Sequence, residues 1–256
     1  MDKKYAVVAC EVMYRDVCTC AAKSPNVSDL FFVRQGLHDL GQIKMPIELQ
    51  KELDTIDTSK YDALLLCYGL CCNGVCGLKV DIPIVLPRAH DCITLFMGSK
   101  ERYRDYFDLN PGTMFSAGGW VDLDIELGFD ETRSMFGDMS YAEFVEQHGR
   151  EAAEYVKEML YSYLDRYKKV AFINNDIGDI EKYRNAALDQ ARQYDWDFEE
   201  VEGSTRLIQN MLDGIWPEED FLVIEPGHTI CPSFDDLIVR EVALLGQSDC
   251  PTLAGK

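Results

Sequence analysis

The chain has 256 residues, of which 47% are hydrophobic and 27% are charged, and its formal net charge is -20. A field of that sign repels a phosphate backbone, so nucleic acid is excluded as an expected partner. No run approaches the roughly 20 apolar residues of a membrane span, and the first residues lack the apolar region of a signal peptide, so we expect a globular protein of the cytoplasm with no membrane partner.

The sequence contains ten cysteines. The cytoplasm keeps thiols reduced, which favours metal binding or redox chemistry over a disulfide framework. The alternative for an isolated cysteine is a small buried hydrophobe. We expect that role for Cys67, at the apolar end of a strand, and an unimportant exposed thiol for Cys250, in the polar tail.

Short apolar runs in the first third of the chain predict strands that are buried on both faces of a sheet. These runs are Lys4 to Cys10, Leu30 to Val33, Ala63 to Leu66 and Ile82 to Leu86. Between the second and third runs, Pro46 to Ile56 has apolar residues at near-helical spacing, with the proline at an allowed first-turn position. A strand, a crossover helix and a strand imply a parallel sheet with right-handed connections.

The stretch from Ala63 to Cys92 joins two of these strands to most of the plausible ligands. In such folds, ligands collect beyond the carboxyl ends of the strands. The thiols of YGLCCNG and the imidazole and thiol of RAHDC would then project from neighbouring strand ends into one crevice. That arrangement suits a metal or cluster site better than a packed core.

For the other cysteines and histidines, the sequence gives weaker evidence of metal binding. Cys18 and Cys20 form a C-x-C pair, but nothing nearby supplies the second pair of a zinc knuckle. His38 lies at the exit of the second strand, which strengthens the case for a ligand, although a lone histidine is more often structural. His228 and Cys231 have H-x-x-C spacing after a later strand but no adjoining pair.

After the cysteine-rich stretch, helices are expected on both sides of a break at Gly98-Ser99. The segment PGTMFSAGGW supplies glycines that allow close approach to a ligand, without forming a dinucleotide fingerprint. Ser140 to Arg166 predicts one long amphipathic helix, in which Ser140 and Glu143 have the spacing of a capping box.

The rest of the chain repeats strands and helices, with expected elements at Val170 to Ile173, Asp179 to Trp196, Phe198 to Val201, Thr205 to Ile215 and a final buried strand at Phe221 to Ile224. This order predicts an α/β protein with a mostly parallel sheet and flanking helices, Rossmann-like in type. We expect two α/β halves, residues 1–135, which carry the Cys/His site, and residues 136–256. The alternative is that the two halves form one continuous domain.

Five short motifs give the sequence a resemblance to a known family: YGLC, PRAHDCI, a GS-x-x-x-Y stretch, PGTMF and GGW. In these motifs the sequence resembles the uncharacterised family known as domain of unknown function 1638. The likeness runs from AC at residue 10 through QGLH at residue 38 to the PG at residues 226 and 227. Members occur in anaerobic bacteria and methanogens, often beside corrinoid-dependent methyltransferase systems, so the resemblance implies an anaerobic cytoplasm and a methyl-transfer setting. Carried onto this chain, the family pattern selects Cys10, His38, Cys71, His90 and Cys92.

Cys10, Cys71 and Cys92 come from three separate strand exits, which resembles the way some anaerobic α/β enzymes hold a four-iron (4Fe-4S) cluster with one open iron. Thiolates suit iron-sulfur clusters and zinc alike, and catalytic zinc also uses three protein ligands. The anaerobic setting and ligation by cysteine alone favour the cluster. His90 or His38 as a ligand would favour zinc.

Cys72 and Cys76 are additional to the family pattern, so the choice between Cys71 and its neighbours stays open. Cys18, Cys20 and Cys231 remain further candidates.

The leading hypothesis is an iron-sulfur protein, an enzyme with lyase-like or transferase-like chemistry, whose open iron acts as a Lewis acid on a small oxygen- or sulfur-bearing substrate. Arg88 would clamp a carboxylate or phosphate, and His90 would serve as acid or base. Asp91 is expected to cap the following helix. The alternatives are a non-catalytic accessory that binds zinc or a corrinoid protein, and a small-metabolite binding protein with structural cysteines.

Overall fold

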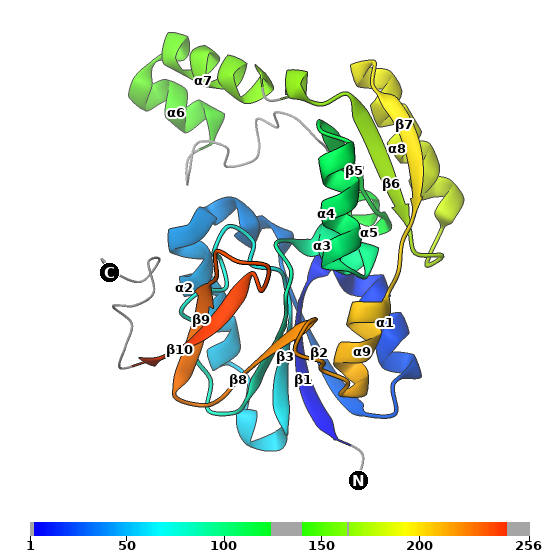
Figure 1. Cartoon of the computed structure of the whole chain (residues 1–256). Helices are drawn as coiled ribbons and strands as arrows, with labels where there is room; N and C mark the ends of the chain where they lie inside the picture. The colour runs from blue at the N-terminus through cyan, green and yellow to red at the C-terminus, as the bar shows by residue number, and fades with distance from the viewer. Residues whose placement is uncertain (1–2, 124–139, 163, 245–256) are drawn as a thin grey trace.

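The computed structural model describes residues 3–123, 140–162 and 164–244, except for the side chains at 38, 39, 160 and 161. Within these ranges the strands form one five-stranded, one three-stranded and one two-stranded sheet (Figure 1). The class is mixed α/β with mostly parallel sheets, as the sequence predicts. None of the described helices is long and apolar enough to cross a membrane.

Sheet A has the strand order β2-β1-β3-β4-β8. Its members are β1 (Lys4–Cys10), β2 (Val27–Val33), β3 (Ala63–Cys67), β4 (Ile84–Pro87) and β8 (Phe221–Ile224). The first four strands run parallel, whereas β8 is antiparallel to β4. The four strands predicted in the first third of the chain are confirmed.

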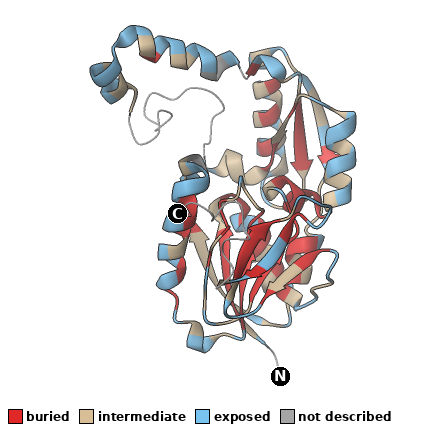
Figure 2. Ribbon diagram, turned by 60° about the vertical axis from the view of Figure 1, so that its left-hand side comes forward, coloured by how far each residue is buried: buried red, intermediate tan, exposed pale blue. Residues whose placement is uncertain are grey.

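Helices cover both faces of sheet A, which explains why its strands are continuous apolar runs. Along β3, Leu65 and Cys67 belong to the core under α1 (Tyr14–Lys23) and α9 (Arg206–Asp213). Leu64 and Leu66 belong to the opposite core, under α2 (Gly41–Asp54). Burial of each of these leucine side chains contributes roughly 1.5–3 kcal/mol to the stability of the fold. Figure 2 shows these strands as the most buried part of the molecule.

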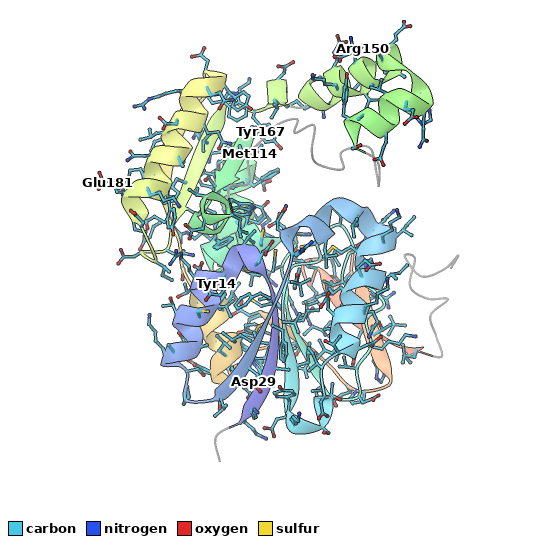
Figure 3. All side chains as sticks on the ribbon, turned by 180° about the vertical axis from the view of Figure 1, so that it is seen from behind. Tyr14, Asp29, Met114, Arg150, Tyr167 and Glu181 are labelled. Atoms are coloured by element: carbon cyan, nitrogen blue, oxygen red, sulfur yellow. The ribbon has the colours of Figure 1, made fainter. Side chains whose placement is uncertain are left out.

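The strand order places a topological switch point between β1 and β3. From β1 the chain passes through α1 to β2 on one side, and then through α2 to β3 on the other. Open α/β sheets bind ligands at the carboxyl ends of the strands that flank such a point. Tyr14, labelled in Figure 3, opens α1 just beyond this edge and packs its ring on Phe32, with ring centroids 4.8 Å apart.

Sheet B consists of three parallel strands, β5 (Thr113–Ser116), β6 (Lys169–Asn174) and β7 (Asp197–Glu202). Helix α8 (Ile180–Tyr194) covers one face. On the other face, α4 (Lys100–Leu109) packs Tyr103 and Tyr106 on Phe115. Ala171 and Ile173 of β6 belong to the same buried cluster as Val7 of β1, so the two sheets share a core.

Each of the two large sheets contains strands from both residues 1–135 and residues 136–256. The chain leaves sheet A after α3 (Cys92–Met97), builds sheet B and returns through α9 to β8. Sheet B takes β5 from the first predicted half, and sheet A takes β8 from the second. The reason is that the apolar face of α9 has its partners in sheet A, beside α1.

Two helix breaks coincide with glycines of positive φ. The predicted break between α3 and α4 is confirmed at Gly98, with φ 71°. The predicted helix from Ser140 to Arg166 is instead two helices, α6 (Tyr141–His148) and α7 (Arg150–Ser162), because Gly149 has φ 85°. The capping box of Ser140 and Glu143 is present.

Three strands were missed by the sequence analysis. β5 is short and lies in the glycine-rich segment, for which no strand was predicted. β9 (His228–Pro232) and β10 (Val239–Ala243) pair as an antiparallel hairpin after β8, so β8 is not the final strand.

Candidate functional site

Three cysteines lie at the carboxyl ends of three adjacent strands of sheet A. Cys10 ends β1, Cys71 follows β3, and Cys92 opens α3 after β4. Burial, together with the nearby charges of Asp91 and Cys10, raises the pKa of Cys71 to about 12. Burial also raises the pKa of Cys92, as do Cys71, Asp91 and Cys10. The structure therefore brings the three predicted ligands to one edge of the sheet.

Backbone hydrogen bonds join the segment after β3 to the segment after β4. The N–H of Leu70 donates to the carbonyl of Ala89 at 2.8 Å, and that of Cys71 donates to the carbonyl of His90 at 2.9 Å. Gly69 allows this approach, since a Cβ there would lie 2.5 Å from the Cα and N atoms of Asp91. The position of Cys71 relative to Cys92 is thus set by the backbone.

The chain turns through a left-handed conformation directly at the site. Cys71, Cys72 and Asn73 have φ values of 46°, 54° and 68°. For non-glycine residues this conformation costs roughly 1–2 kcal/mol each, and such strain gathers at functional sites. Gly74 closes the turn by donating to the carbonyl of Cys71 at 3.0 Å. The N–H groups of Cys72 and Asn73 donate to no other described residue.

Asp91 caps α3, as expected from its place before the helix. Its Oδ1 accepts from the N–H groups of Ile93 at 3.0 Å and Thr94 at 3.4 Å. Its Oδ2 accepts from the hydroxyl of Tyr103 at 3.0 Å. Burial raises the pKa of Asp91, and the hydrogen bond from Tyr103 counters that rise. Since Tyr103 lies on α4, an element that packs on sheet B forms part of the site.

Tyr68 is a site residue that the sequence analysis missed. It follows β3 directly, is 4% exposed, and its hydroxyl has no hydrogen-bond partner among the described residues. The hydroxyl nevertheless lies near enough to Cys10 to lower the pKa of that thiol, which burial raises to about 11. The only sequence signal was the place of Tyr68 after a buried strand, in YGLC.

The predicted glycine-rich segment also reaches this edge. Helix α5 (Gly118–Asp122) packs on the 3₁₀ turn Glu11–Met13, and a Cβ on Gly119 would lie 1.6 Å from the carbonyl oxygen of Val12. Gly119 therefore permits close approach of the backbone that follows Cys10.

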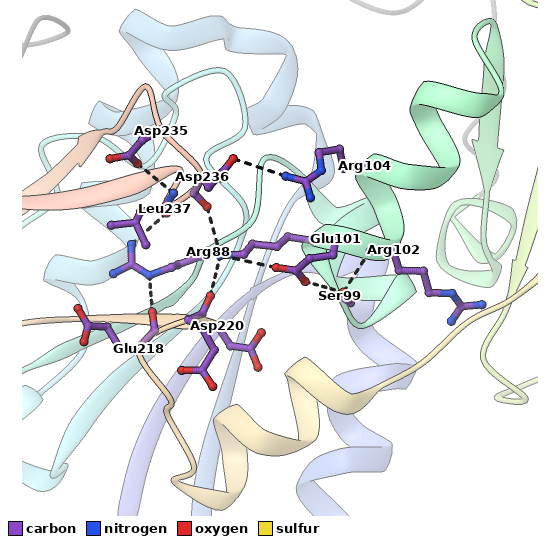
Figure 4. Close-up of polar contacts among 12 residues, drawn as sticks. Arg88, Ser99, Glu101, Arg102, Arg104, Glu218, Asp220, Asp235, Asp236 and Leu237 are labelled. Carbon is purple, nitrogen blue, oxygen red and sulfur yellow. Dashed lines mark hydrogen bonds and ion pairs between the residues drawn. The ribbon is translucent and has the colours of Figure 1, made fainter.

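Arg88 points away from the cysteines. Its Nε donates to the carbonyl of Glu218 at 2.7 Å, and its Nη1 donates to the carbonyls of Leu237 at 3.0 Å and Val239 at 2.6 Å (Figure 4). The side chain is buried, and burial lowers its pKa. These contacts tie the end of β4 to the segment before β8 and to the start of β10, so the guanidinium is not turned towards a ligand in the crevice.

The two predicted histidines differ in what the structure describes. The His90 side chain is exposed, and its charge lowers the pKa of Asp91, which places it at the rim of the site. The backbone of His38 lies in a 3₁₀ turn, Gln35–Leu40, after β2. The side chain of His38 lies outside the described part of the chain.

The remaining cysteines lie elsewhere. Cys18 and Cys20 are two apart on α1, so their side chains do not face each other. Cys67 is fully buried in the core, as expected, and Cys72 is exposed. Cys231 is disulfide-bonded and offers no thiolate. Two further cysteines complete the set: Cys76 is buried under α2, and Cys250 lies outside the described residues.

A groove of about 800 Å³ lies away from the cysteine site. It is lined by the last turns of α2 and by residues 76–81, which precede β4, so it opens at the amino ends of the strands. Lys51 and Lys79 lie on its wall.

Among residues 3–123, 140–162 and 164–244, no three His, Cys, Asp or Glu side chains are arranged to hold a metal ion as they stand. The chemistry of the donor set does fit a thiolate-ligated centre. Three free thiols converge, and a buried hydroxyl and two N–H groups beside them have no partner among the described residues. Binding would require the thiols to deprotonate and to close on the metal.

The chain matches no curated protein and no solved structure. The family described as Protein of unknown function (DUF1638) matches residues 32–212, which include Cys71 and Cys92 but not Cys10. Since this match spans well over half of the chain, the protein belongs to the DUF1638 family.

Proposed function

We propose that the crevice of Cys10, Cys71 and Cys92 binds a 4Fe-4S cluster with one open position and presents it to a small molecule. One observation carries the proposal: three free thiols lie together at the carboxyl ends of three adjacent parallel strands, beside the switch point of the sheet. That edge is where folds of this type bind ligands.

The unpaired donors favour a sulfur-rich centre. The hydroxyl of Tyr68 and the N–H groups of Cys72 and Asn73 all lack acceptors among the described residues. Thiolate and sulfide sulfurs accept hydrogen bonds, and such bonds set the reduction potentials of clusters. Zinc is the alternative occupant, held by the same thiolates in a non-catalytic accessory protein.

The bound cluster would supply Lewis acidity to an oxygen- or sulfur-bearing substrate. The cysteines hold the centre, Asp91 fixes the start of α3, and His90 stands at the rim as acid or base. Arg88 has no part in this proposal, because its guanidinium is bound to main-chain carbonyls.

The setting of the protein is part of the proposal. The order β2-β1-β3-β4 supports a doubly wound sheet A, which is Rossmann-like in the broad sense only, because a Rossmann sheet has the order 3-2-1-4. Eight of the nine described cysteines are free thiols, which supports a cytoplasmic location, whereas the disulfide of Cys231 is the exception. The family resemblance supports a corrinoid protein as partner.

Purification without oxygen, followed by analysis of iron, acid-labile sulfide and zinc, tests the proposal. We expect iron and sulfide at about four each per chain, the composition of the cluster. Cys71→Ala and Cys92→Ala should remove most of both. Cys72→Ala is the matched control, since its thiol is adjacent but exposed. Zinc in place of iron would support the accessory role, and protein without either metal would contradict both.

A further inference from the structure

Tyr68 carries a polar group that the described fold leaves without a partner. Its ring packs in the core under α2, and 4% of the residue is exposed. Its hydroxyl makes no hydrogen bond within the described residues. A buried donor without an acceptor is unfavourable, so a second state of the site is expected to provide one.

The surroundings of the hydroxyl identify the acceptor. Tyr68 follows Cys67, which pairs with Ala9 across β3 and β1, so Tyr68 lies beside Cys10 at the next register position. Tyr68 belongs to the core under α2, and Cys10 packs against that core. Cys67 is fully buried in the core, with its Sγ 4.0 Å from Met13 Sδ. The sulfur of Cys10 lies at the strand end, in the crevice.

We infer that Tyr68 is a positioning residue for the metal centre, donating a hydrogen bond from its hydroxyl to the sulfur of Cys10 once that sulfur is a metal-bound thiolate. This inference rests on the proposed function. A neutral thiol is a weak acceptor, whereas a thiolate is a strong one, so the bond forms when metal replaces the proton. Donation to a ligand sulfur stabilises the more negative, reduced form of a cluster.

Tyr68→Phe is the direct test, because it removes one oxygen and keeps the ring. We expect anaerobically prepared Tyr68→Phe protein to keep its iron and to show a midpoint potential below that of the wild type, measured by redox titration with electron paramagnetic resonance. Tyr106→Phe is the matched control, since its hydroxyl bonds Glu199 on sheet B. Its potential should equal that of the wild type.

Two further measurements keep the inference open to refutation. If Tyr68→Phe does not fold, 3-fluorotyrosine at position 68 preserves the shape and makes the phenol a stronger donor, so the potential should rise. If the metal is zinc, Tyr68→Phe should lose about 10–100-fold in zinc affinity, the usual effect of removing a partner of a ligand. Wild-type protein without metal would defeat the proposed function. If the wild type binds metal but Tyr68→Phe has the same midpoint potential or zinc affinity as the wild type, the role of Tyr68 is refuted and the proposed function stands.

Discussion

The hydroxyl of Tyr103 donates to Oδ2 of Asp91 at 3.0 Å. This bond joins α4, which packs on sheet B, to the N-cap of the helix that begins with Cys92. The start of α3 is therefore fixed from both parts of the fold.

Replacing Asp91 tests this cap. We expect Asp91→Ala to lower the free energy of unfolding by about 0.5–2 kcal/mol, the usual cost of losing an N-cap side chain. Asp91→Asn should lose less, because its amide oxygen still accepts from the first turn. Urea unfolding followed by circular dichroism measures both. A free energy of unfolding of Asp91→Ala equal to that of the wild type would show that the cap contributes nothing.

Gly69→Ala should separate the two cysteine-bearing segments. Its Cβ would meet backbone atoms of Asp91 at 2.5 Å, which no side-chain rotation relieves. We expect a clear loss of stability together with loss of bound metal. Gly36→Ala is the control, since no atom lies within 4 Å of its added Cβ. The test is to measure the metal content and the urea midpoint of both variants. A Gly69→Ala protein with the same metal content and urea midpoint as Gly36→Ala would refute this prediction.

Arg88 is expected to affect stability rather than metal content. Hydrogen bonds from charged groups contribute about 1.5–3 kcal/mol each, and Arg88 makes three to buried or part-buried carbonyls. Arg88→Ala should therefore lower the urea midpoint strongly. The control Arg104→Ala removes an exposed arginine, 3.5 Å from Asp236, and should change little. A stable Arg88→Ala protein with lost activity would instead support the clamp predicted from the sequence.

Alkaline pH should destabilise the protein through its buried thiols. Burial raises the pKa of Cys20 to about 11, above the 9.0 of an exposed thiol. Because the folded-state value is the higher one, this contribution to stability is complete below pH 9 and is lost as the pH rises towards 11. The urea midpoint should fall over that range, and less steeply in Cys20→Ala. Identical pH profiles of the urea midpoint for wild type and Cys20→Ala would show that Cys20 does not cause the loss of stability at alkaline pH.

The sequence predicted the part of the site that depends on local pattern. Cys10 and Cys71 were placed at strand exits because strands buried on both faces are continuous apolar runs. The role of Arg88 was missed because its partners, Glu218, Leu237 and Val239, are far away in the sequence. No local pattern encodes such contacts. β5 was missed because a four-residue strand beside glycines has no periodicity to detect.

Tyr68 was missed for a different reason. A tyrosine after an apolar strand has the composition of a core residue, and its ring is indeed in the core. Only the coordinates reveal that the hydroxyl has no partner among the described residues.

The return of the chain to sheet A has a consequence for synthesis on the ribosome. β4 pairs along one side with β3, and along the other with β8, which is made only after the whole of sheet B. Until β8 emerges, β4 has an open edge, and Arg88 lacks all three of its carbonyl acceptors. An unpaired apolar edge is a site for aggregation. A nascent chain of this protein therefore completes its cysteine-bearing sheet only after sheet B, although most of that sheet is translated first.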